Sequence, residues 1–384
     1  MLSIGLLVHV QQLTESFAAA GAVVGTFAAA SSVGGPVLGR LIDARGQSRP
    51  LVAAAACSAA ALGAVACLPP GTAVPIWMTL TGVAGLTLPP VGACMRALLP
   101  ALVDRAELQT AYALEATATE LAFVAGPPVA LLAAGLTSPA VAIAEAACLV
   151  GVTTLMFAKQ PASRVWRSSS PPQRDRVGAL RSSGMQTVVV AFLFVGILFG
   201  AVEVGVAASG SNTAATGALL GLWGAGSLLG GLTLTRLGAP RAQAPQLALL
   251  LGALAAAHLA LGGAVVSQLA LAGVLVLAGA SISPMYTTVN GMVERVAPQG
   301  MTTEAFAWLT TAVGGGTALG SALAGVVAEH RGASASFVLA GVAGAAASAI
   351  VVSRARTLRA APSIQKRRLA CAGSSQPSTS LSTG

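Results

Sequence analysis

Five ionisable side chains lie within long apolar stretches of the sequence, where a charged group can bind an ion, a proton or a charged substrate. Inside a lipid bilayer each of them would cost at least a few kcal/mol without a partner, so each requires a partner or a function. The five residues are Arg96, Glu115, Glu120, Glu145 and Glu203.

The positions of these five residues in the sequence favour different partners for them. Arg96 and Glu115 are expected at equal depth on consecutive helices, which favours an ion pair and leaves direct contact with a substrate as the alternative. Glu120 follows Glu115 by five residues, about 140° around a helix, so the two carboxylates cannot face the same partner. Glu145 and Glu203 stand alone among small apolar residues. We interpret each either as a proton or substrate site facing a cavity or as a protonated carboxyl in an interhelical hydrogen bond.

No set of residues in the sequence predicts catalysis, metal binding or nucleotide hydrolysis. The three histidines are widely spaced, the five cysteines include no CxxC pair, and neither lysine belongs to the Gly-rich loop that a P-loop requires. We therefore expect a protein that is not an enzyme, holds no metal and needs no cofactor beyond a proton gradient.

The composition predicts a polytopic membrane protein of the all-α class. Hydrophobic residues make up 55% of the 384 residues and charged residues only 9%, with a mean hydropathy of +0.80, which is too few charges for a water-exposed surface. Apolar blocks of about twenty residues match the bilayer thickness, and lipid requires them to be helical. We place eleven complete spans at 16–38, 51–69, 76–99, 111–135, 139–158, 187–208, 213–235, 244–264, 267–290, 304–328 and 333–353.

The opening stretch MLSIGLLVHVQQLTES is too short to be a further complete span. Its apolar residues number about eleven, which reach about half the membrane thickness. We interpret this stretch as the second half of a first helix whose beginning is missing from the sequence.

Basic residues lie almost entirely on one side of the predicted spans. The stretch GRLIDARGQSR (39–49), short turns on the same side, the connector and the tail hold all of the 21 basic residues except Arg96 and Arg331. The positive-inside rule places this side in the cytoplasm. We expect a multi-pass plasma-membrane protein with a cytoplasmic linker at 159–186 and a disordered cytoplasmic tail at 354–384. The pI of about 10.4 then reflects topology and anionic lipid, and no nucleic acid partner is expected.

The linker separates two predicted transmembrane bundles, 1–158 and 187–353, which share a weak internal repeat. The repeated stretch GLTLTRLGAPR also contains Arg236. Two such repeats are typical of secondary transporters. An offset of 192 residues pairs Gly39 with Gly231, Gly46 with Gly238, and Arg49 with Arg241.

The stretch GRLIDARGQSR resembles the signature loop of the major facilitator superfamily, which has the form G-x-x-x-D-R/K-x-G-R/K and joins the second and third helices. Gly39, Asp43 and Gly46 match this form, whereas Arg45 and Arg49 are displaced from its basic positions. The resemblance implies two pseudo-symmetric six-helix bundles around a central cavity. It also implies alternating access by rocking of one bundle against the other.

The resemblance implies a role for Asp43 as well. The acid of this loop is expected to dock against the opposite bundle when the cytoplasmic side is closed, at the start of the helix that begins GMTTEAF. Thr302 or Thr303 would be the cap of that helix. The repeated stretch has Thr235 in place of the aspartate, which predicts a contact made by the first bundle only.

Glu304 lies close to this expected docking point and would repel the carboxylate of Asp43. Arg45 or Arg49 is therefore expected to bridge the two acids.

Gly126 and Pro127 resemble the start of the G-P-x-x-G-G element of superfamily antiporters, although Ala130 and Leu131 replace its later glycines. A Gly-Pro kink at a helix interface is the alternative. The resemblance favours a proton-coupled exporter of a small amphipathic molecule, working as a monomer. An importer or facilitator of a sugar or metabolite is an alternative, and so is a sensor or a truncated protein without transport activity.

Overall fold

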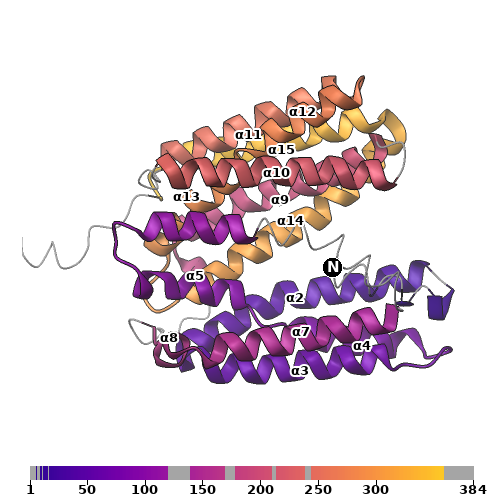
Figure 1. Ribbon diagram of the computed structural model, residues 1–384, viewed down its shortest axis with the longest axis vertical. Coiled ribbons are helices and arrows are strands. Elements are labelled where there is room, and N and C mark those ends of the chain that lie inside the picture. Colours follow the sequence, from indigo (N-terminus) through magenta and orange to yellow (C-terminus); the bar gives the residue numbers. More distant parts are fainter. Residues whose placement is uncertain are drawn as a thin grey trace, which may run out of the picture.

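The computed structural model describes residues 6, 9–10, 12–15, 17–119, 139–168, 178–209, 213–237 and 244–358. Within these ranges every regular element is a helix, as the composition predicts. Residues 108–119 form a helix without a label in Figure 1. The labelled elements are α2 (Phe17–Arg45), α3 (Ser48–Ala66), α4 (Val74–Leu86), α5 (Val91–Leu102), α7 (Pro139–Lys159), α8 (Pro161–Val165), η1 (Gly178–Arg181), α9 (Ser183–Ser209), α10 (Thr213–Leu237), α11 (Ala244–Ala264), α12 (Gln268–Gly279), α13 (Ile282–Val296), α14 (Thr302–Arg331) and α15 (Ala333–Ser353).

The helices form two bundles that lie beside each other (Figure 1). Helices α2, α3, α4 and α7 pack together in the first bundle, and α9 to α15 make up the second. The two sets of ribbons approach each other where α5 lies and diverge toward the opposite end. We call the first of these the linker end, and define it by the end of α2, the start of α14, α8 and η1.

Nine helical stretches of the described residues are long and apolar enough to cross a membrane. The predicted span 139–158 is α7, and the predicted span 111–135 begins in helix 108–119 and continues outside the described residues. The nine stretches are Ala22–Arg45, Ser48–Ala66, Val74–Leu102, Ser183–Ser209, Thr216–Leu234, Ala244–Ala264, Gln268–Val296, Thr302–Arg331 and Ala333–Ser353.

Two predicted spans are each divided into two helices. The span predicted at 76–99 consists of α4 and α5, which are separated at 87–90, where Pro89 and Pro90 lack the N–H groups that would continue the helix. The span predicted at 267–290 consists of α12 and α13, because Pro284 cannot donate a hydrogen bond to the carbonyl of Ala280.

The signature stretch is mostly helical, so its prediction as a loop after residue 38 is wrong. Helix α2 continues to Arg45, Gly46 makes the turn, and α3 begins at Ser48. The charged residues Arg40 and Asp43 end the apolar part of the span, but neither side chain opposes a helix strongly. The apolar stretch of the sequence therefore ends several residues before the helix ends.

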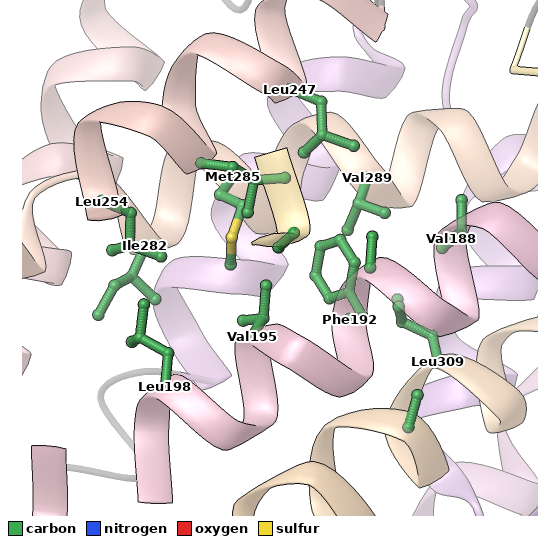
Figure 2. Close-up of a cluster of buried hydrophobic side chains, with 14 of the residues drawn as sticks. Val188, Phe192, Val195, Leu198, Leu247, Leu254, Ile282, Met285, Val289 and Leu309 are labelled. Atoms are coloured by element: carbon green, nitrogen blue, oxygen red, sulfur yellow. The ribbon is translucent and has the colours of Figure 1, made fainter. Parts of the chain in front are cut away.

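The largest hydrophobic cluster lies mainly in the second bundle and extends to α5 and helix 108–119 (Figure 2). In the first bundle a smaller cluster surrounds Trp77, and it includes Leu6 and Val10 from the described part of the N-terminal stretch. The side chains labelled in Figure 2 come from α9, α11, α13 and α14: Val188, Phe192, Val195, Leu198, Leu247, Leu254, Ile282, Met285, Val289 and Leu309.

Glycines allow α9 and α14 to approach each other at backbone distance. They lie four residues apart on each helix, Gly196 and Gly200 on α9 and Gly316 and Gly320 on α14. A Cβ atom added at any of the four would press against backbone atoms of the other helix. Small residues at this spacing give transmembrane helices the close van der Waals contact that lipid does not provide.

Candidate functional site

Asp43 caps α14 across the boundary between the bundles. The backbone N–H of Thr303 donates to Asp43 Oδ1 at 3.1 Å and that of Glu304 donates to Oδ2 at 2.9 Å. Asp43 is only 3% exposed. The first residue before α14 is Met301, whose side chain makes no capping hydrogen bond. The docking point is therefore the expected one, but the cap comes from the other bundle and not from a threonine of α14 itself.

The buried carboxylate of Glu304 accepts hydrogen bonds from four donor groups. Arg40 Nε donates to Oε2 at 3.1 Å and Arg40 Nη2 donates to Oε1 at 2.8 Å. Two further bonds to Oε1 come from the backbone N–H of Ala179 at 3.1 Å and from Trp308 Nε1 at 3.3 Å. Ala179 belongs to η1, so the connection between the bundles takes part in the same contact.

The predicted bridge by Arg45 or Arg49 is wrong, because the basic partner of Glu304 is Arg40. Both of the predicted residues are exposed and have no hydrogen bond or ion pair within the described ranges. Arg40 and Asp43 are three residues apart in α2, which puts both on one face of the helix. This three-residue spacing in the sequence could have indicated that Arg40 lies beside Asp43 at the docking point.

The two related glycines of the repeat lie at equivalent contacts between the bundles. A Cβ atom at Gly39 would lie 2.8 Å from the Cα of Glu304, and one at Gly231 would press against Thr117 and Ser283. The hydroxyls of Thr117 and Ser283 are 3.3 Å apart. Gly39 of α2 thus lies against α14, and Gly231 of α10 lies against both helix 108–119 and α13.

The first part of the linker also contacts the signature stretch. Gly46 has a φ of 86°, and a Cβ atom there would lie 2.6 Å from Nη1 of Arg167. Arg167 Nη1 donates to the carbonyl of Trp166 at 2.7 Å, and Trp166 Nε1 donates to the carbonyl of Ala97 at 3.3 Å. Only glycine suits this turn, since it tolerates the positive φ and leaves room for the guanidinium.

A substitution at Gly178 will test the part of η1 in this contact. Gly178 has a φ of 61°, and a Cβ atom there would press against Arg40 and Glu304. We expect Gly178→Ala to break the bond from Ala179 to Glu304, so that the amide of Ala179 exchanges with deuterium about ten times faster, which corresponds to about 1.4 kcal/mol. Hydrogen-exchange mass spectrometry of the peptide that covers 178–182 measures this.

Gly71→Ala is the matched control for that variant. Gly71 has a φ of 82°, but no atom lies within 4 Å of the Cβ position. The backbone strain is therefore comparable, while the contact at η1 is untouched. Equal protection of Ala179 in both variants would show that η1 does not depend on this contact.

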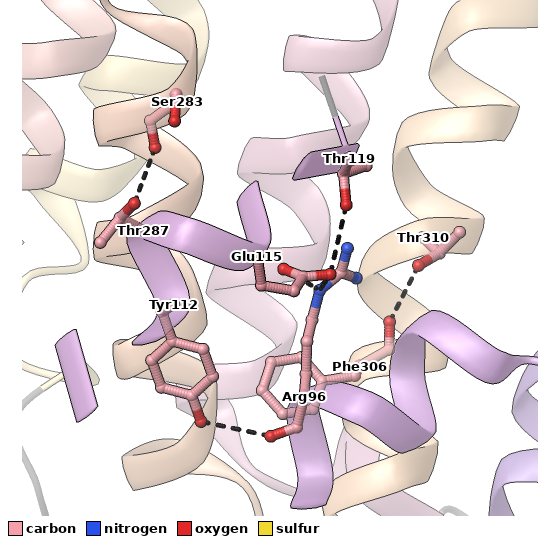
Figure 3. A network of polar contacts seen from close by, with 8 residues as sticks. All are labelled: Arg96, Tyr112, Glu115, Thr119, Ser283, Thr287, Phe306 and Thr310. Atoms are coloured by element: carbon pink, nitrogen blue, oxygen red, sulfur yellow. Dashed lines mark hydrogen bonds and ion pairs between the residues drawn. The ribbon is translucent and has the colours of Figure 1, made fainter. Parts of the chain in front are cut away.

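Arg96 and Glu115 form the predicted ion pair (Figure 3). Arg96 Nε lies 3.1 Å from Glu115 Oε1 and 3.0 Å from Oε2, and the side chains are only 13% and 11% exposed. The hydroxyl of Thr119 donates to Glu115 Oε1 at 3.3 Å, and the hydroxyl of Tyr112 donates to the backbone carbonyl of Arg96 at 3.4 Å. Tyr112 also packs against Phe306 of α14, with 6.3 Å between the ring centroids.

Comparison with known families agrees with this geometry. The family model described as Major Facilitator Superfamily matches residues 1–320. This chain belongs to the major facilitator superfamily. It is a multi-pass membrane protein, and the superfamily to which it belongs moves small molecules across membranes by alternating access. A comparison with curated proteins gives no match.

Solved structures of superfamily transporters share the fold at low sequence identity. The human organic anion transporter MFSD10 (TETRAN) superposes with a TM-score of 0.66 and 16% identity, over 93% of this chain and 89% of that one. The E. coli fucose:proton symporter FucP gives 0.66 and 15%, over 93% and 97%. The proton:xylose symporter XylE gives 0.67 and 13%, over 92% and 91%.

The remaining candidate residues of this superfamily member fall into two groups. Glu145 on α7 and Glu203 on α9 are exposed, and neither carboxyl has a hydrogen-bond partner in the described part of the chain. The described ranges contain no cluster of three His, Cys, Asp or Glu side chains that could hold a metal. The other predicted residues lie outside the residues, or the side chains, that the structure describes: Glu120, Gly126, Pro127, Thr235, Arg236, Gly238 and Arg241.

Proposed function

We propose that this chain is a proton-coupled exporter of a small amphipathic molecule, and that the contact between Asp43 and α14 is its cytoplasmic gate. The observation that carries the proposal is the capping of α14 from the other bundle. A carboxylate at a helix N-terminus is stabilised by the backbone N–H groups and the helix dipole. Opening the linker end separates α2 from α14 and must therefore break both hydrogen bonds.

Further contacts between the bundles support a closed linker end. The hydroxyl of Thr311 on α14 donates to the carbonyl of Ser32 on α2 at 2.9 Å, two turns beyond the Asp43 contact. On the neighbouring helices Tyr112 packs against Phe306. With this end closed, a substrate would enter and leave from the opposite end, which corresponds to an outward-facing state.

The distribution of arginine side chains supports a cytoplasmic linker end in the plasma membrane. The opposite end of the described bundles has Arg331, at the end of α14. The positive-inside rule favours the cytoplasm for the more basic side. The arginines at the linker end include Arg40, Arg45, Arg49, Arg164, Arg167, Arg181, Arg295 and Arg354.

Glu203 is the proposed site of proton coupling. It lies one turn after Phe199 on the same face of α9, and Phe199 packs against Trp223 and Tyr286 with centroid distances of 5.4 Å and 6.4 Å. An acid that has no partner among the described residues, beside an aromatic cluster, supports a site where a proton and an amphipathic substrate meet. The carboxyl would load a proton on one side and release it on the other.

We expect Glu203→Gln to abolish proton-driven flux and to retain substrate binding, because the amide keeps the size of the side chain but cannot carry a proton. Susceptibility of cells to a panel of amphipathic toxic compounds, with and without expression of the chain, identifies a substrate. Flux of that compound into proteoliposomes under an imposed pH gradient then measures coupling.

Glu329→Gln is the control, since Glu329 is an exposed carboxylate at the end of α14. Proton-driven flux that is unchanged in Glu203→Gln would contradict the role of Glu203. Uptake by whole cells, with no extrusion of any compound, would instead favour an importer or facilitator.

A further inference from the structure

The guanidinium of Arg96 uses only one of its donor groups in the ion pair with Glu115. Both carboxylate oxygens are bonded to Nε, and no described residue accepts a hydrogen bond from the terminal nitrogens Nη1 and Nη2. These nitrogens are also not among the side-chain atoms that are sealed from solvent without a partner. The edge of the guanidinium that binds carboxylates in a bidentate manner therefore stays open.

An exposed face of α14 lies next to this edge. Phe306, Thr310 and Gly314 follow one another at four-residue spacing on one face of α14, and Phe306 contacts Tyr112. Thr310 and Gly314 are both exposed, and no atom of the described residues lies within 4 Å of a Cβ position at Gly314. Figure 3 shows Thr310 on the side of α14 that faces Arg96.

Helix 108–119 provides the opposite wall. Glu115 and Thr119 follow Tyr112 by three and seven residues, so they share its face and lie above the contact between Tyr112 and Phe306. Both helices run away from the linker end, and this contact between the two rings therefore forms a floor just above the gate. A molecule that enters from the opposite end meets the open edge of Arg96 at this floor.

The donor groups that remain unbonded at this floor favour a ligand that accepts hydrogen bonds. The hydroxyl of Thr119 donates to Glu115 and that of Thr310 donates to the carbonyl of Phe306, so neither hydrogen is free. The terminal N–H groups of Arg96 are the donors that remain. A planar anionic acceptor, which is a carboxylate, matches the fork of a guanidinium best.

We propose that Arg96 binds the carboxylate of an organic anion through its terminal nitrogens, while its Nε stays paired with Glu115. The inference rests on the proposed transport function and names its substrate class. The ligand carboxylate and Glu115 then share one guanidinium, and the positive charge between the two carboxylates offsets their mutual repulsion.

Among the described residues, the other charged groups on neighbouring helices do not contact the terminal nitrogens of Arg96. Arg96 is the only charged residue of α5, and Tyr112 is the other titratable group of the facing helix wall. On α13, Glu294 interacts electrostatically with Tyr112. Arg105 and Arg295 are the opposite charges that interact with Glu294. On α14, Glu304 is already paired with Arg40.

The charge of Glu115 limits how tightly the anion binds. Glu115→Gln removes this negative charge next to the open edge of the guanidinium, so it should bind the anion more tightly than the unaltered protein does.

Isothermal titration calorimetry on the purified full chain tests the proposal with hexanoate and benzoate as probes, and with hexanamide and benzamide as neutral counterparts of the same shape. We expect at least one carboxylate to bind and neither amide to do so. Glu294→Gln should leave the affinity for the carboxylate unchanged, because Glu294 does not contact Arg96.

The double variant Arg96→Gln/Glu115→Gln replaces the ion pair with two neutral amides, which avoids leaving a single buried charge. It should lower the affinity for the carboxylate at least tenfold. The proposal is overturned if neither carboxylate binds, if an amide binds equally well, or if the double variant binds unchanged. Such a result would leave the gate at Asp43 and the transport function standing, since those are measured by flux and accessibility.

Discussion

Replacing Asp43 with asparagine will lower transport and shift the protein toward a state that is open at the linker end. The amide can accept from only one of the two N–H groups that Asp43 now binds, and it loses the attraction between a charge and the helix dipole. That attraction amounts to about 0.3–2 kcal/mol. Since about 1.4 kcal/mol is a tenfold change in a population, the expected shift is about twofold to thirtyfold.

Cysteine labelling will measure the shift. Ala307 is 2% exposed and lies at the contact between α14 and α2, where a Cβ atom on Gly35 would be 3.9 Å from its own Cβ. In a chain whose five native cysteines are replaced by alanine, Ala307→Cys should react with a maleimide several times faster when Asp43→Asn is also present. Asp104→Asn, which alters an exposed carboxylate of the same end, is the control.

Unchanged labelling together with normal flux in Asp43→Asn would show that the signature stretch serves membrane topology alone. Faster labelling with normal flux would show that the gate closes without limiting transport.

Gly316→Leu will prevent the second bundle from folding. A Cβ atom on Gly316 would lie 2.9 Å from the Cα of Gly196 and 3.0 Å from the backbone nitrogen of Ile197, and it would press against the carbonyl of Leu193. These are backbone atoms, which cannot move aside as a flexible side chain does. Overpacking of a tight core costs about 1–3 kcal/mol and more where the surroundings are rigid, so we expect loss of the monodisperse protein in size-exclusion chromatography.

Gly314→Leu makes the same change two residues earlier on α14, where the Cβ position is open. It should leave the elution profile and the thermal unfolding temperature unchanged. Similar behaviour of both leucine variants would mean that contact between α9 and α14 does not limit stability.

The sequence predicts the helices well where lipid sets their length. The spans 213–235, 244–264 and 333–353 lie within two residues of α10, α11 and α15, because the thickness of the bilayer bounds both ends. The sequence predicts the breaks within a span less well. Pro89, Pro90 and Pro284 were visible in the sequence, but hydropathy is continuous across the breaks that they cause.

The candidate site was predictable in part. Resemblance to a signature stretch located Asp43 and its docking helix, and equal depth on two helices located the pair of Arg96 and Glu115. The ion pair of Arg40 with Glu304 and the bond from Ala179 to Glu304 were missed. The first required the knowledge that α2 continues to Arg45, and the second depends on how the connection between the bundles returns to α14.

The capping of α14 by a residue of the other bundle links the gate to the integrity of a helix end. When α2 moves away, the first turn of α14 loses the acceptor that now satisfies two of its N–H groups, and Met301 has no side-chain oxygen to replace it. We expect this turn to become hydrated or to fray in the inward-open state. The cost of each opening then includes a local unwinding of α14, and mutations that stabilise its first turn will speed opening without touching either the gate or the substrate.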